Sequence, residues 1–153
     1  MKREKTLATI CLLLIILYVY TAVAKLIDPP EFTRQLSNQV FPKWTIPILL
    51  WALPVSELTV AILIVFDTTR KYGLLGSVLL MTVFTGYMLL VVFKVFDRVP
   101  CSCGGVISSM SFPVHLIFNL FFLAISIVGL YINHLFKTNQ RDTEVKNDKT
   151  ETA

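Results

Sequence analysis

Four long apolar runs constrain the fold of this chain more than any other feature. They span residues 7–24, 46–66, 73–93 and 114–136, and each is close to the roughly 20 residues that an α-helix needs to cross about 30 Å of hydrocarbon. Backbone amides must be satisfied internally in lipid, and these runs show no period-2 alternation, so helices are favoured over a β-barrel. The sequence therefore predicts an all-α integral membrane four-helix bundle.

Composition and segment lengths predict one membrane domain and a polar tail. Hydrophobic residues make up 55% of the 153 residues and charged residues 16%, which excludes an ordinary soluble domain. Residues 1–136 are accounted for by a single four-helix transmembrane domain. Residues 137–153 hold many charges and no apolar run, so we expect a disordered cytoplasmic tail.

Basic residues beside the spans predict the orientation. The N-terminus, the connection between the second and third spans, and the tail together hold nine Lys and Arg residues, against five on the other side. Because basic flanks are retained in the cytoplasm, we predict a protein of the bacterial inner membrane with both termini on the cytoplasmic side. This distribution also explains the net charge of +4. The charge therefore reflects the arrangement of the chain in the lipid bilayer, and no nucleic acid partner is predicted.

The start of the chain also resembles a signal peptide. A basic start is followed by an apolar stretch and the small-residue sequence of residues 22–24. The apolar run is long and ends in Tyr18 and Tyr20, which suit an interfacial belt, so an uncleaved first span is expected.

A pair of cysteines follows the third span. Cys101 and Cys103 are separated by one residue and followed by Gly104 and Gly105. Such a pair closes a small, strained disulfide, and strained bridges exchange more readily than structural ones. The predicted orientation places the pair on the oxidising periplasmic side. A redox-active pair is the favoured interpretation. A permanent disulfide and two free thiols without a chemical role are the alternative interpretations.

A metal site is a further chemical alternative for the same thiols. Thiolates select copper(I) or zinc, but zinc normally requires four ligands. The loop offers only Cys101 and Cys103, with His115 a dozen residues on, and Cys11 lies near the opposite membrane face. No metal is therefore predicted, and Cys11 is expected to pack or to face lipid.

Polar residues inside the spans are the second candidate group. Glu57 lies near the middle of the second span. An ionisable side chain is costly in hydrocarbon, so it usually serves a structural or functional role there. Glu57 is expected to be protonated, to bond to a neighbouring helix, or to relay protons.

On the fourth span, His115, Asn119, Phe122 and Ser126 share one helix face that we expect to look into the bundle. His115 is a candidate for stabilising a thiolate, with simple solvation as the alternative. Lys25, at the end of the first span, is expected to reach the headgroups.

These residues together resemble the MauE/DoxX group of small four-helix membrane proteins, in particular its MauE-like branch. The resemblance covers roughly residues 7–134. It is carried by YTAVAKLIDP at residues 20–29, Phe32, LPVSEL at residues 53–58 and PCSCGG at residues 100–105. The group often has a phenylalanine between the glycine positions after the second cysteine, and Gly104-Gly105 departs from that pattern.

The resemblance implies a thiol-disulfide redox protein that supports maturation of exported disulfide-containing proteins, as in maturation of the methylamine dehydrogenase small subunit. It implies Cys101 and Cys103 as the redox pair, with Glu57 and His115 as accessory candidates. The implied partners are a periplasmic thioredoxin-like protein and a secreted client.

Two other functions stay open at this point. One is a non-catalytic membrane assembly or transport factor, in which the disulfide only stiffens a loop. The other is a quinone-linked electron carrier, in which Glu57 and the face of His115 and Asn119 line a quinone pocket.

Overall fold

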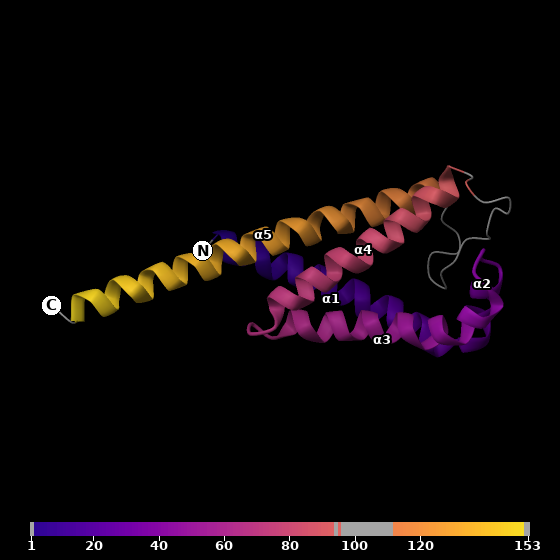
Figure 1. Ribbon diagram of the computed structural model, residues 1–153, viewed down its shortest axis with the longest axis horizontal. Helices are drawn as coiled ribbons and strands as arrows, with labels where there is room; N and C mark the ends of the chain where they lie inside the picture. The colour runs from indigo at the N-terminus through magenta and orange to yellow at the C-terminus, as the bar shows by residue number, and fades with distance from the viewer. Residues whose placement is uncertain (1, 94, 96–111, 152–153) are drawn as a thin grey trace.

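The computed structural model describes residues 2–93, 95 and 112–151, and the regular structure in these residues is helical throughout. Four long helices form the bundle (Figure 1): α1 (Lys2–Ile27), α3 (Ile46–Val65), α4 (Arg70–Val92) and α5 (Phe112–Glu151). Two short elements, α2 (Pro29–Ser37) and the 3₁₀ turn η1 (Lys43–Thr45), connect α1 to α3. The predicted all-α four-helix bundle is confirmed.

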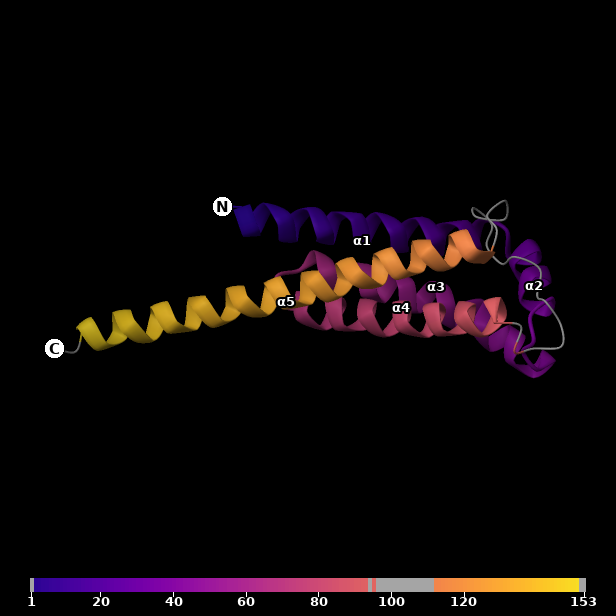
Figure 2. The ribbon, with the colours of Figure 1, turned by 90° about the horizontal axis from the view of Figure 1, so that it is seen from above.

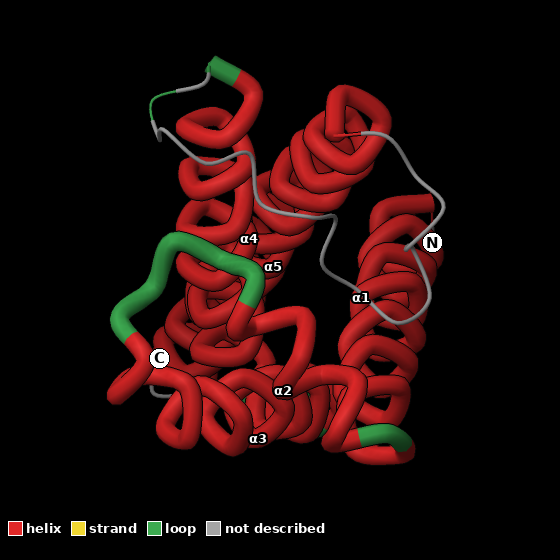
Figure 3. Tube along the Cα trace, turned by 90° about the vertical axis from the view of Figure 1, so that its right-hand side faces the viewer, coloured by secondary structure: helices red, strands yellow, loops and turns green. Residues whose placement is uncertain are grey.

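The long helices run up and down along one axis. The N-terminus and the C-terminal end of α5 lie toward one end, while α2 lies at the other (Figure 2). The last turn of α4 and the first turn of α5 also lie at the end where α2 lies (Figure 1). Figure 3 views the bundle from that end and shows α2 lying across α3, with which it is in contact.

The four long helices satisfy the length and hydropathy expected of membrane spans. The candidate spans are Arg3–Ile27, Lys43–Val65, Arg70–Val92 and Pro113–Thr138. Many of their large apolar side chains are exposed on the outside of the bundle, including Ile16, Trp51, Leu79 and Ile117. Such apolar exterior surface is what lipid-facing helices require. The chain is therefore a multi-pass membrane protein.

Helix α5 differs from its prediction at its C-terminal end. Residues 137–153 were predicted to be disordered, whereas α5 continues as a single helix to Glu151. Residues 137–151 contain no glycine or proline. Because the preceding span already supplies a helical nucleus, the polar segment needs only propagation, and helix-breaking residues are absent. Charge content alone did not reveal this continuity.

Proline and aspartate set the junction between α1 and α2. Pro29 and Pro30 fill the first positions of α2, where a missing N–H group costs no hydrogen bond. The Asp28 carboxylate caps α2 by accepting a hydrogen bond from the Glu31 backbone N–H at 3.0 Å. The chain therefore turns sharply at the end of the first span.

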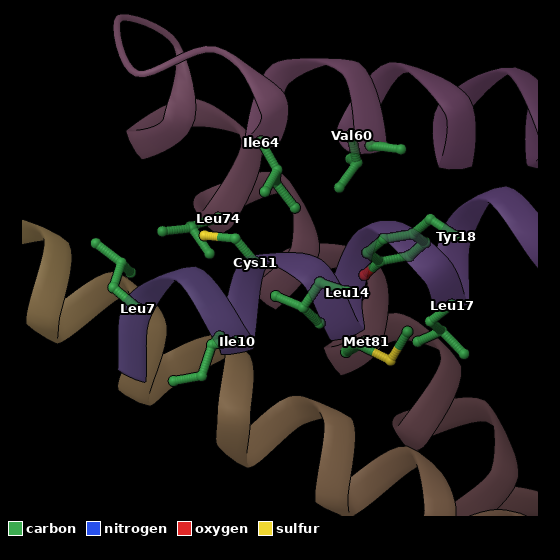
Figure 4. Packing of buried hydrophobic residues seen from close by; sticks show 11 residues of the cluster. Leu7, Ile10, Cys11, Leu14, Leu17, Tyr18, Val60, Ile64, Leu74 and Met81 are labelled. Carbon is green, nitrogen blue, oxygen red and sulfur yellow. The ribbon is translucent and has the colours of Figure 1, made fainter. Parts of the chain in front are cut away.

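The core lies where α1 meets α3, α4 and α5. Leu14, Tyr18, Ile64 and Leu74 are almost completely buried, and Figure 4 shows their side chains between the helices. Cys11 belongs to the same cluster, so of the two sequence-based alternatives for Cys11, packing is the one observed.

A chain of hydroxyl groups crosses this apolar core. The Tyr18 hydroxyl lies 2.9 Å from Ser77 Oγ, which lies 2.8 Å from Ser126 Oγ. Ser126 in turn donates to the Phe122 carbonyl at 2.7 Å. Tyr18, Ser77 and Ser126 are each fully buried. These bonds join α1, α4 and α5, and interhelical hydrogen bonds of this kind contribute about 0.6 kcal/mol each in membrane proteins.

Candidate functional site

The predicted thiol pair lies outside the described residues. Cys101, Cys103 and the two glycines after them fall within residues 96–111, so the redox pair stays a prediction. The described helix ends on either side of this segment, the last turn of α4 and the first turn of α5, lie at the α2 end of the bundle (Figure 1). The groups described below from α1 and α2 lie toward that same end.

A buried ion pair joins α1 to α3. The Lys25 ammonium donates to Glu57 Oε1 at 2.6 Å, and the two side chains are 18% and 2% exposed. Of the three roles expected for Glu57, bonding to a neighbouring helix is the one observed. Lys25 was expected to reach the headgroups, but its ammonium turns inward to this carboxylate instead, because a buried charge needs a partner of opposite sign.

The surroundings of the ion pair are asymmetric. Lys25 Nζ also donates to the Thr21 carbonyl at 3.4 Å and lies 5.9 Å from the centroid of the Phe32 ring. This placement adds a cation–π contact to the ion pair. The second carboxylate oxygen, Glu57 Oε2, has no hydrogen-bond partner among the described residues. Glu57 therefore retains capacity to accept a hydrogen bond in a place that water does not reach freely.

A cavity of about 240 Å³ adjoins the ion pair. Its walls come from the last turn of α1 and from α2. The lining residues are the polar Lys25, Asp28, Glu31 and Gln35 and the apolar Ala24, Ile27 and Phe32. Lys25 thus has one side toward Glu57 and another toward this space.

The charged side chains of α2 are fixed by local bonds. Arg34 donates to Glu31 through Nε at 2.7 Å and through Nη2 at 2.6 Å, and Gln35 adds a third bond at 3.0 Å. The hydrogen bonds from Arg34, followed by the one from Gln35, lower the pKa of Glu31 to about 2. Glu31 is therefore a carboxylate throughout the physiological pH range.

A second set of polar contacts ties the α2 region to α4. Tyr87 donates to Gln39 Oε1, and the Gln39 amide donates to the Gln35 carbonyl at 3.3 Å. The Phe41 and Tyr87 rings stack with centroids 5.2 Å apart. The cavity wall formed by α2 is thereby braced against the membrane helices.

The predicted face of the fourth span does look into the bundle. Asn119 and Ser126 are buried, while His115 and Phe122 are half-buried. Among the described residues, no hydrogen bond or ion pair joins His115 to Lys25 or Glu57. The structure therefore brings Glu57 and Lys25 together and leaves His115 in the first turn of α5, the helix that follows the thiol segment.

Sequence reasoning did not predict the partner of Glu57 or the cavity. Lys25 and Glu57 are 32 residues apart, and α2 was not predicted as a helix. The sequence did contain one signal for this pair. Glu57 is the single acidic residue in the four apolar runs, and Lys25 is a basic residue directly after the first run. Antiparallel spans bring such residues within reach when their depths match.

The comparisons with known proteins agree with the resemblance seen in the sequence. A family model described as methylamine utilisation protein MauE matches residues 3–132. Searches among curated proteins and among solved structures gave no match. The matched range contains α1, α2, α3 and α4 and the first half of α5. The chain therefore belongs to the methylamine utilisation protein MauE family, and this membership implies a role in methylamine utilisation.

Proposed function

We propose that this protein is a membrane thiol-disulfide redox protein that supports maturation of an exported disulfide-containing protein. The observation that carries the proposal is the sequence Cys101-Ser102-Cys103 in the segment that joins α4 to α5, two helices long and apolar enough to span a membrane. A thiol pair in a short segment between two spans suits exchange with soluble partners at the membrane surface.

The orientation of the bundle supports this chemistry. The end of α4 and the start of α5 lie at the end of the bundle opposite the two termini (Figure 2), as four spans require. The excess of basic residues beside the termini favours a cytoplasmic location for them. The thiols then face the periplasm, where disulfides form and persist.

The proposed mechanism is reversible thiol-disulfide exchange. A thiolate of the partner attacks one sulfur of the Cys101–Cys103 bridge, so that one S–S bond forms as another breaks and the second cysteine leaves as a thiolate. A second thiolate of the partner resolves the mixed disulfide, and the partner emerges oxidised while the pair emerges reduced. The bridge is restored when the reduced pair attacks the disulfide of a second, oxidised thiol-disulfide partner by the same two steps, which leaves that partner reduced. A periplasmic thioredoxin-like protein and a secreted client are the proposed partners.

Serine substitution of the thiols tests this function. Cys101→Ser and Cys103→Ser are each expected to lower the amount of oxidised, mature client to the level found in cells that lack the protein, because exchange needs both sulfurs. Cys11→Ser is the matched control, since Cys11 is buried in the core and should leave maturation unchanged. The measurement is the disulfide state of the methylamine dehydrogenase small subunit, the client implied by the family resemblance. Full maturation with Cys101→Ser would refute the exchange mechanism and favour a non-catalytic assembly role.

A further inference from the structure

Two buried hydrogen-bond donors have no acceptor among the described residues. They are Nε of Arg70, the first residue of α4, and Nδ2 of Asn133 in α5. The start of α4 lies toward the end of the bundle that carries the N-terminus (Figure 1), and Asn133 is only 5% exposed. Because leaving a buried donor without an acceptor costs free energy, the two atoms indicate that an acceptor binds here.

Contacts along the seam between α4 and α5 place the two donors opposite each other. A Cβ atom added to Gly129 in α5 would lie 3.3 Å from the Leu74 side chain in α4. Arg70 lies four residues before Leu74, and Asn133 lies four residues after Gly129. Since the helices are antiparallel and residues four apart share a face, Arg70 and Asn133 meet one turn beyond that contact. An Arg N–H and an Asn N–H cannot bond to each other, so an oxygen between them satisfies both.

Positive charge surrounds the two donors. Lys137 lies four residues after Asn133, on the same face of α5. Arg70 begins α4, and the dipole of that helix adds positive charge at its first turn. Nη2 of Arg70 pairs with Asp67, whose side chain is 84% exposed, but Nε stays without a described partner. An anionic oxygen therefore fits this place better than a neutral one.

The depth of the two donors in the membrane identifies the anion. The candidate span of α4 begins at Arg70, and the candidate span of α5 ends at Thr138. The donors therefore lie where the hydrocarbon ends and the headgroups begin, which is the depth of lipid phosphates. Basic pockets between membrane helices at this depth suit anionic headgroups.

We propose that the seam between α4 and α5 at this end of the bundle binds the phosphate of an anionic phospholipid. The phosphate accepts hydrogen bonds from Arg70 Nε and Asn133 Nδ2 and is attracted by the Lys137 ammonium. A choline headgroup brings a positive charge of its own beside that lysine, so phosphatidylglycerol binds more tightly than phosphatidylcholine. The proposal does not depend on the thiol chemistry, because the cysteine pair follows α4 at the opposite end of that helix.

Native mass spectrometry of the full chain in a neutral detergent, after removal of co-purified lipid, tests the proposal with phosphatidylglycerol as the probe. One saturable lipid adduct is expected. Its affinity should fall about tenfold or more in Asn133→Leu and in Arg70→Met, because each removes a donor to a charged oxygen. Asn119→Leu is the matched control and should bind as the parent does. Asn119 is equally buried on the same face of α5, nearer the other end of the bundle.

Three further probes show which part of the lipid is bound. Diacylglycerol lacks the phosphate and phosphatidylcholine lacks the net charge, so both should bind at least about tenfold more weakly than phosphatidylglycerol. Inorganic phosphate at the lipid concentration should not displace the adduct. Equal affinity for either neutral lipid would overturn the proposal, and so would an adduct that Asn133→Leu leaves unchanged. Displacement by inorganic phosphate would assign the site to the free ion and overturn its assignment to a lipid.

A stability measurement prevents a folding defect from imitating loss of the site. Asn133→Leu removes a buried group without a described partner, so in lipid-free micelles the variant should be at least as stable as the parent. Phosphatidylglycerol should then raise the free energy of unfolding of the parent and not that of the variant. A variant less stable than the parent without lipid would overturn the proposal, because Asn133 would then serve contacts within the protein.

Discussion

Replacing Lys25 with methionine is expected to destabilise the folded bundle by about 3–5 kcal/mol, because it leaves the buried carboxylate of Glu57 without its cation. Glu57 is 2% exposed, and its one ion pair among the described residues is the 2.6 Å contact with Lys25. Methionine keeps most of the lysine stem, so lost packing contributes little to the expected change. The free energy of unfolding in mixed detergent micelles, with denaturing detergent as the variable, is the measurement.

Two control variants make this expectation specific to the ion pair. The double variant Lys25→Met/Glu57→Met removes both charges while keeping apolar volume, and it should recover most of the lost stability. Arg34→Met breaks the pair with Glu31, in which the arginine side chain is 68% exposed, and should cost less than about 1 kcal/mol. A double variant as unstable as Lys25→Met would contradict the assigned role of the pair.

Replacing Gly73 with alanine is expected to cost about 3 kcal/mol, at the upper end of the range for overpacking. A Cβ atom at this position of α4 would lie 2.6 Å from the Ile64 backbone nitrogen and 2.8 Å from the Leu63 carbonyl carbon of α3. Backbone atoms cannot turn aside as a flexible side chain does, so the two helices must separate. Close approach of helices at small residues is a common way for spans to pack in membranes.

Gly86 provides the matched control for Gly73 on the same helix. A Cβ atom at Gly86 would meet no heavy atom within 4 Å. Gly86→Ala should therefore leave stability unchanged or raise it by about 1 kcal/mol through helix propensity. Unfolding of both variants under the same conditions gives the comparison, and equal destabilisation of the two would show that the α3–α4 contact is not as close as described.

The membrane spans could be predicted from the sequence because one physical requirement dominates them. A helix crossing hydrocarbon needs about 20 apolar residues in succession, and that pattern needs no tertiary information. The predicted run 46–66 corresponds to α3 at Ile46–Val65, and the run 73–93 to α4 at Arg70–Val92. The N-terminal extension of α1 to Lys2 lies outside the apolar run, so hydropathy does not mark it.

Contacts between distant residues could not be predicted in the same way. The hydroxyl chain joins Tyr18 to Ser77, 59 residues on, and Ser77 to Ser126, 49 residues further. Ser126 was predicted on an inward face, but Tyr18 was expected in an interfacial belt and is instead fully buried in the core. Only the packing of three helices brings these residues together. The Lys25–Glu57 pair has the same character, although an isolated acid in a span does indicate that some partner exists.

The short helix α2 was missed for a different reason. Its nine residues carry only Phe32 and Leu36 as buried large apolar side chains, and the buried Gln35 lies between them. Such a short segment gives little periodic signal. The Asp28 cap followed by Pro29 and Pro30 was the local indication of a helix start.

The most direct test of the central claim is thiol trapping with a membrane-impermeant maleimide in intact cells, before and after mild reduction. A reducible Cys101–Cys103 bridge on the periplasmic face predicts labelling only after reduction, loss of that labelling when both residues are serine, and a mixed-disulfide adduct with a partner in Cys101→Ser. Labelling without prior reduction would contradict the bridge, and the absence of labelling even after reduction would contradict the orientation.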